Sequence, residues 1–302
     1  NTLALSLCMF YWLRGLRGTD EVTAALFVFS AFFISVGIVY LLSFLPTRAQ
    51  NIIGMALIVA QFAFLGPAGL RAEHPTERPH RRARTFFTFA RSNIQDSRFL
   101  AACAVGMALL GFVDGFLRGY PDGLPIPFTW SSRLAYALCS MLICALLMLL
   151  VVRRRERVVT VDAFITMALL ASLSLVLFGA FPYHWEIGAV AVNTLNIVIC
   201  AYCWYVIIAF TSFGTRDPYI YAMGGWVICF GSRSLARMLL YFTYPLAGND
   251  LLINSLLGAL VLISTQVVLV QFMHAERGES SAEADRLEAE NERVMRQAEA
   301  DA

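Results

Sequence analysis

The stretch SRLAYALCSMLICALLMLLVV, residues 132–152, contains one charged side chain and is followed directly by the cluster RRRER, residues 153–157. A helix of about 20 predominantly apolar residues is long enough to cross the hydrocarbon core of a bilayer. Arginine gathers on the cytoplasmic side of membrane proteins. The stretch is therefore expected to form a transmembrane helix that ends at the cytoplasmic surface.

Apolar runs of this kind recur along the whole chain, which has 302 residues and is 59% hydrophobic but only 15% charged. Soluble domains average about 45–50% apolar and about 25% charged residues. This composition excludes a disordered chain and a nucleic-acid-binding domain held by charge alone. We expect an all-α, polytopic membrane bundle of about nine transmembrane helices. The apolar runs cover residues 1–13, 22–45, 52–70, 99–117, 132–152, 161–181, 187–210, 219–242 and 251–273.

The connecting loops alternate between arginine-rich and arginine-poor, and this alternation predicts the orientation. Residues 71–98 and 153–157 are rich in arginine and are expected in the cytoplasm, whereas 119–128 and 243–250 are expected outside. Every basic residue is arginine, a bias typical of G+C-rich bacterial coding sequences. The expected location is the bacterial cytoplasmic membrane, with multiple passes and a cytoplasmic C-terminus.

Four segments follow from these runs and loops. Residues 1–70 are expected to form three transmembrane helices, the first of them truncated, and residues 71–98 a basic cytoplasmic connecting loop. Residues 99–273 are expected to form a six-helix half-bundle, and residues 274–302 a cytoplasmic linker or signalling helix. Because the alternation places the N-terminus outside, we also expect that upstream helices are missing from this sequence.

The tail differs in composition from the rest of the chain, since residues 276–302 read ERGESSAEADRLEAENERVMRQAEADA. Leu287 and Val294 at heptad position d would place Asn291 at position a, where a polar residue sets the register of a dimer. Fewer than three heptads is weak evidence for a coiled coil. Two interpretations stay open: a solvated linker helix, which we favour, and a homodimer formed through residues 280–302.

Polar side chains inside the predicted spans mark the candidate site, because such groups are costly in a bilayer. With a rise of 1.5 Å per residue, Arg237, Asp114 and Asn193 lie about 10, 9 and 8 Å from the centres of their helices. Arg233 and Asn196 each lie about 4 Å from the centre, on the same outward side. The five side chains therefore fall on two predicted levels.

This cluster has two interpretations. In the structural one, the arginines pair with Asp114 or with helix carbonyls and only hold the bundle together. In the functional one, which we favour, they line a cavity whose external mouth carries Arg133, at about 13 Å. Asp114 can neutralise one arginine, so a small, partly apolar organic anion would satisfy the other. No catalytic motif or metal-ligand set accompanies the cluster, so we expect no enzyme activity, metal or cofactor.

The stretches FVDGFLRGY (112–120) and GSRSLAR (231–237), together with the tail, carry a resemblance to a known family. The last six predicted helices resemble the C-terminal half of a major-facilitator (MFS) bundle, and all nine resemble the last three quarters of its twelve helices. An MFS-like domain followed by an acidic, alanine-rich helix resembles the membrane sensor part of LuxR-type regulators from G+C-rich bacteria. The resemblance implies a helix-turn-helix domain that these 302 residues do not contain.

The expected function is therefore a membrane-embedded small-molecule sensor that relays ligand binding to the absent DNA-binding domain. The alternative is an MFS-type secondary transporter of a small organic anion, which would use the same cavity for alternating access. A structural membrane subunit is a third, weaker interpretation. The expected partners are the lipid bilayer and an anionic small molecule, with DNA contacted only through the absent domain.

Overall fold

The computed structural model describes residues 16, 19, 21–69, 97–120, 126–154, 162–181, 183–213, 218–243, 253, 256–267 and 270. These residues are almost entirely helical and include no β-strand, so the expected all-α fold is confirmed. The helices are α2 (Glu21–Leu42), α3 (Thr47–Gly69), α6 (Ser97–Gly119), α7 (Trp130–Arg154), α8 (Ala163–Ala180), α9 (Trp185–Phe213), α10 (Pro218–Trp226), the π-helix η2 (Val227–Gly231) and α11 (Ser232–Thr243). A further short helix covers Leu256–Val267.

Four of the helices are long and apolar enough to cross a membrane. They are Val22–Leu42, Trp130–Arg153, Ala163–Ala180 and Trp185–Ile208. These spans support a membrane protein, whereas the count of nine transmembrane helices stays a prediction. The predicted span 1–13, the basic loop 71–98 except its last two residues, and the tail 274–302 lie outside the described residues.

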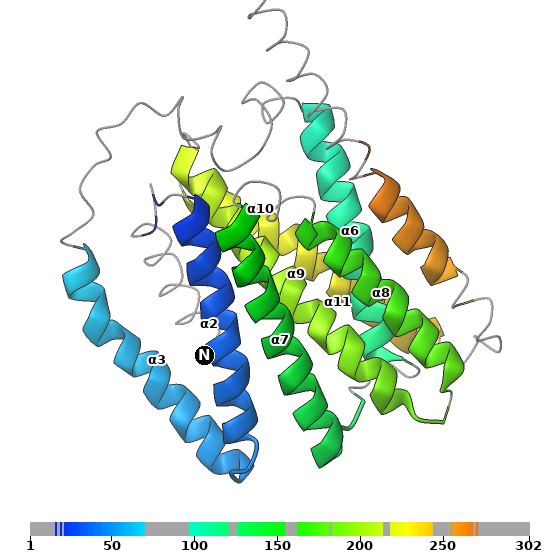
Figure 1. Ribbon diagram of the computed structural model, residues 1–302, viewed down its shortest axis with the longest axis horizontal. Coiled ribbons are helices and arrows are strands. Elements are labelled where there is room, and N and C mark those ends of the chain that lie inside the picture. The colour runs from blue at the N-terminus through cyan, green and yellow to red at the C-terminus, as the bar shows by residue number, and fades with distance from the viewer. Residues whose placement is uncertain are drawn as a thin grey trace, which may run out of the picture.

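The central helix of the bundle is α9, which packs against α2, α6, α7, α8 and α10. Its side chains Val192, Leu195 and Tyr205 are fully buried. In Figure 1, α2 and α7 lie side by side in front of α9, while α8 covers another of its sides. Because α9 packs against five of the other described helices, it forms the centre of the bundle.

The outer faces of the helices are as apolar as the inner ones. On α8, Phe164 and Met167 are buried, whereas Leu169 and Val176 on the other face are 65% and 64% exposed. A helix that is hydrophobic all round belongs in a large core or in a membrane. Soluble monomers rarely expose apolar surface on this scale, so these outer faces are suited to contact with lipid.

Between α2 and α3 the chain turns earlier than the apolar run predicts. The run 22–45 was expected as one helix, but α2 ends at Leu42 and a turn follows, in which Leu45 N–H donates to the Leu42 carbonyl at 2.9 Å. Pro46 then starts α3, since its carbonyl accepts from Ala49 N–H at 2.8 Å. Proline is favoured at helix starts because its ring presets φ and no donor is lost. Helix α3 stands at the edge of the bundle (Figure 1).

Candidate functional site

Helices α6 and α11 approach each other closely because α6 presents glycines to its neighbour at every fourth position. A Cβ added at Gly111 would lie 2.8 Å from the carbonyl oxygen of Cys229, and one at Gly115 would lie 2.8 Å from the Cα of Arg233. At Gly119 an added Cβ would lie 3.4 Å from the Arg237 side chain. Small residues at such spacing let helix backbones approach in membranes. They place Asp114, on α6, beside the arginines of α11.

Asp114 and Asn196 both contact the guanidinium of Arg233. The Nη1 atom of Arg233 lies 3.7 Å from Oδ2 of Asp114 and also donates a hydrogen bond to Oδ1 of Asn196. The Asp114 side chain is 1% exposed and that of Arg233 is 25% exposed. Three helices, α6, α9 and α11, therefore meet at one charge-assisted contact. The depths predicted from the sequence place Arg233 level with Asn196, and Asp114 level with Arg237. In the structure, Asp114 instead forms its ion pair with Arg233.

A π-helix lies immediately before this contact. Residues 218–243 run as one helix in which η2, Val227–Gly231, separates α10 from α11. The hydroxyl of Ser232 donates to the Ile228 carbonyl at 2.8 Å and supports the helix just after the π-turn. π-turns inside α-helices occur frequently at functional sites. Here the π-turn sets the direction in which Arg233 leaves the helix.

Arg237 lies one turn farther along α11 and has fewer partners. Its Nη2 atom donates to the carbonyl of Arg118 at 3.4 Å, a long hydrogen bond, and its buried Nε atom has no described acceptor. Oδ1 of Asp114 is also buried and accepts no hydrogen bond from a described residue. Among the described residues, Asp114 forms an ion pair with Arg233 alone. Arg118 and Arg237 therefore have no counter-ion in the described part of the chain.

An aromatic row leads from α9 to the cluster. The ring of Trp226 packs edge-on against Trp204 at 6.3 Å and against Phe230 at 5.5 Å. Phe230 in turn lies 4.8 Å below the guanidinium carbon of Arg233, in cation–π geometry. Trp226 thus reaches Arg233 only through the ring of Phe230. Its buried Nε1 donor is unpaired among the described residues.

Besides Arg237, two more of the six predicted site residues lie apart from the contact that joins Arg233, Asp114 and Asn196. The amide Nδ2 of Asn193 donates to the Ala189 carbonyl of its own helix at 2.8 Å. The guanidinium of Arg133 lies 5.2 Å above the ring of Trp130, which stacks on Phe44 at 5.0 Å. Arg133 thus belongs to an aromatic stack between α7 and the α2–α3 turn. The ligand-binding role of all six residues stays a prediction.

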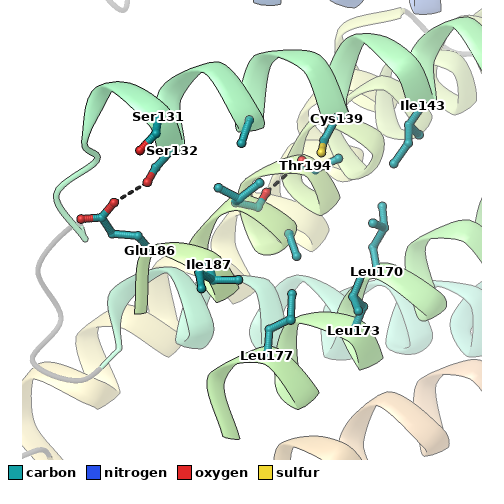
Figure 2. A pocket seen from close by; sticks show the side chains of 13 residues that line it. Ser131, Ser132, Cys139, Ile143, Leu170, Leu173, Leu177, Glu186, Ile187 and Thr194 are labelled. Carbon is teal, nitrogen blue, oxygen red and sulfur yellow. Dashed lines mark hydrogen bonds between the residues drawn. The ribbon is translucent and has the colours of Figure 1, made fainter. Parts of the chain in front are cut away.

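The structure also contains a pocket that the sequence did not indicate. It has a volume of about 440 Å³ and lies between α7, α8 and α9. Figure 2 shows Ser132 and Glu186 at one end and Cys139, Ile143 and Leu170 farther inside. None of the six predicted site residues lines it. Most of its lining is aliphatic, a pattern that sequence alone does not distinguish from ordinary helix packing or a lipid-facing surface.

Glu186 joins the N-terminal ends of α7 and α9 at the polar end of this pocket. Its Oε2 atom accepts hydrogen bonds from the hydroxyls of Thr129, at 2.6 Å, and of Ser132. Thr129 directly precedes α7, and Glu186 lies in the first turn of α9. A carboxylate is stabilised at helix N-termini, where backbone N–H groups are unsatisfied. The sequence predicted no role for Glu186 between the helices.

Comparisons of the chain with protein-family models, with curated proteins and with solved structures find no match. The described residues contain no group of three or more His, Cys, Asp or Glu side chains that could hold a metal ion. The Arg233 cluster and the pocket with Glu186 are therefore the features that indicate a function.

Proposed function

We propose that the chain is the membrane-embedded sensor domain of a LuxR-type transcriptional regulator, with an MFS-like bundle of about nine spans. In this proposal it lies in the bacterial cytoplasmic membrane with its C-terminus in the cytoplasm. It binds a small organic anion at the cluster around Arg233 and relays binding to a DNA-binding domain beyond residue 302. The support comes from the sequence resemblance and from the charges of the cluster.

The charge imbalance of the cluster is the observation that carries the proposal. Asp114 faces Arg118, Arg233 and Arg237, and it forms an ion pair with Arg233. A guanidinium in a low-dielectric region is strongly disfavoured without a partner. Arg237 is half-buried and keeps an unpaired Nε donor among the described residues. A carboxylate or phosphate is the group that arginine binds with two parallel hydrogen bonds.

The neighbourhood of the cluster indicates what the rest of the ligand is like. Phe230 offers an apolar surface beside Arg233, Trp226 packs against Phe230, and the Trp226 Nε1 atom offers one more donor. A small anion with an aromatic or aliphatic body satisfies both features, because pockets bind most of a ligand through apolar contacts and orient it by few polar ones.

A route from the cluster toward the tail runs through α6. The buried hydroxyl of Ser264, on the helix Leu256–Val267, donates to the Gly106 carbonyl of α6 at 2.6 Å. Gly106 lies two turns before Asp114 on the same helix. A movement of α6 on ligand binding would therefore reach the last described helix, which precedes residues 274–302. For such a relay the ligand need only bind two states of the bundle with different affinity.

The proposal is tested on the purified chain in lipid nanodiscs with a panel of small carboxylates, each beside its uncharged amide. A carboxylate that binds the folded chain stabilises it by RT ln(1 + [L]/Kd) and therefore raises its unfolding temperature as the concentration increases. Arg237→Gln should abolish the shift, whereas Arg48→Gln, on exposed α3, is the matched control. In a reporter built on the full-length gene, Arg233→Ala and Arg237→Ala should abolish the response and Arg133→Ala should weaken it less. Wild-type sensitivity in both inner variants would disprove the site.

A secondary transporter of a small organic anion is the second candidate, and the π-helix favours it. Transporter sites often lie where membrane helices depart from regular α-helical geometry, and η2 is such a departure directly before Arg233. Proteoliposomes that accumulate the stabilising carboxylate would assign the transporter. Binding without uptake, together with a helix-turn-helix in the downstream reading frame, would assign the sensor.

A further inference from the structure

The pocket between α7, α8 and α9 is long. Along α7 its lining extends from Ser131 to Ile143, a rise of about 18 Å in a helix. Leu170, Leu173 and Leu177 form one stripe of α8 along its opposite wall. Helix α9 packs against both α7 and α8 and forms the floor. The shape suits an extended hydrocarbon body.

Polar groups gather at one end of this apolar pocket. Ser131, Ser132 and Glu186 lie where α7 and α9 begin. The same end carries the exposed aromatic residues Trp130 and Tyr183, which are 57% and 92% exposed. Tryptophan and tyrosine are enriched where a membrane meets water. The pocket therefore has its polar end at the membrane–water boundary and its apolar part along the hydrocarbon region.

Glu186 makes the polar end negative. All its hydrogen bonds from Thr129 and Ser132 go to Oε2, so within the described residues Oε1 receives none. Among the described residues, the one ion pair joins Arg233 to Asp114. Glu186 therefore has no arginine partner in that part of the chain. Oε2 accepts the hydrogen bonds that join the starts of the two helices. Oε1 is therefore available to accept from a cationic donor.

We propose that this pocket binds an amphiphilic amine, with its ammonium group on Glu186 and its hydrocarbon chain between α7 and α8. An ammonium group can donate to Oε1 of Glu186 and to the Ser131 hydroxyl, both at the polar end. An anionic head group would face the carboxylate and be repelled. The site is separate from the Arg233 cluster and takes a ligand of opposite charge.

The ligand reaches the pocket from the lipid. Leu173 is 47% exposed and Ile187 is 41% exposed, although both line the pocket, so the lining continues onto the outer surface of the bundle. Cys139 also lines the pocket and is exposed. An amphiphile that partitions into the bilayer is already oriented with its head at the boundary, which lowers the orientational cost of binding.

The test uses the whole chain in phosphatidylcholine nanodiscs and radiolabelled dodecylamine as the probe. Dodecanol and dodecanoate, which share the chain but differ in charge, serve as competitors. Dodecylamine should bind most tightly and dodecanoate least. Glu186→Gln keeps an acceptor for the two helix ends but removes the charge. It should weaken dodecylamine about tenfold, the loss expected for one charge-assisted hydrogen bond, and leave dodecanol unchanged.

Two further measurements locate the bound amine. In a variant with Cys139 as its sole cysteine, dodecylamine should slow alkylation by N-ethylmaleimide. Leu173→Trp should fill the pocket and abolish binding, whereas Val176→Trp, 64% exposed on the same helix but outside the lining, should bind as the wild type does. Thermal unfolding of each variant verifies that it is folded.

Three results would overturn the proposal. They are equal binding of dodecylamine by the wild type and Glu186→Gln, equal affinity for dodecanol and dodecylamine, and unchanged alkylation of Cys139. In a parallel series the nanodiscs contain phosphatidylethanolamine, whose head group also carries an ammonium. Displacement of dodecylamine by this lipid would assign the pocket to a membrane lipid and not to a free amine.

Discussion

Gly115 of α6 lies directly against the backbone of Arg233 on α11, so that a Cβ at position 115 would lie 2.8 Å from the Cα of Arg233. The residue that precedes this glycine, Asp114, is the one that forms the ion pair with Arg233. The ion pair therefore depends on the absence of a side chain at the next position, because any separation of the two backbones lengthens it.

Gly115→Ala should destabilise the protein by about 1–3 kcal/mol, the usual cost of overpacking a tight contact. Gly224→Ala is the matched control, since an added Cβ there meets nothing within 4 Å. In a helix interior that change should be neutral or stabilising by about 0.5–1 kcal/mol. Unfolding in mixed micelles of increasing SDS fraction measures both. Equal stability of the two alanine variants would contradict the close approach.

The Asp114–Arg233 pair should show a measurable coupling energy. Asp114→Asn and Arg233→Gln should each destabilise by about 1–3 kcal/mol, because each leaves the other group without its ionic partner. The double variant should lose less than the sum, by about 0.5–3 kcal/mol. The same cycle between Asp114 and Arg48 of α3 provides the control. Additive losses at positions 114 and 233 would show that the pair contributes nothing.

The π-helix before Arg233 can be removed by deleting one residue. Deletion of Val227, which is 64% exposed, should let η2 close into an α-helical turn. Helix α11 should then keep nearly its present orientation, because four residues of an α-helix turn the chain almost as far as five residues of a π-turn. The coupling energy between positions 114 and 233 should therefore survive the deletion, as it should in Val227→Ala. Loss of the coupling in the deletion variant alone would show that the π-turn itself is needed to hold Arg233 against Asp114.

The predicted orientation is tested by cysteine labelling in a cysteine-free background. Arg82→Cys and Arg153→Cys should react only with permeant reagents in intact cells, because both lie on the predicted cytoplasmic side. Tyr183→Cys, at a side chain 92% exposed beyond the other end of α8, should react with impermeant reagents. Labelling of residue 82 from outside would reverse the assignment.

The helices could be predicted from the sequence because an apolar run as long as residues 132–152 is typical of a membrane-spanning helix. Their ends were less predictable, since Thr47–Gly69 begins five residues before its apolar run. Because Arg48 and Gln50 are polar, the first turn of this helix lies outside the apolar run. The helix begins there because it directly follows Pro46. The nine-span count and the MFS resemblance stay predictions.

Depth along ideal helices predicted only part of the cluster. The predicted depths group Arg233 with Asn196, and these two side chains are hydrogen-bonded. The predicted depths also place Asp114 level with Arg237, because they assume straight α-helices with a uniform rise per residue. The π-turn and the reach of an arginine side chain change the partner. The pocket with Glu186 was not predicted, because its lining comes from three helices and carries no motif.

Thr194 lines the pocket, while Asn196, two residues later on α9, bonds Arg233. Two residues turn a helix by about 200°, so the two side chains leave α9 on opposite sides. Helix α9 thus lies between the pocket and the Arg233 cluster, the two proposed binding sites. If a ligand at one site shifts α9, it changes the affinity of the other site, and thermodynamic reciprocity makes the effect equal in both directions. An amine dissolved in the membrane would then act on the affinity for an anion that arrives from water.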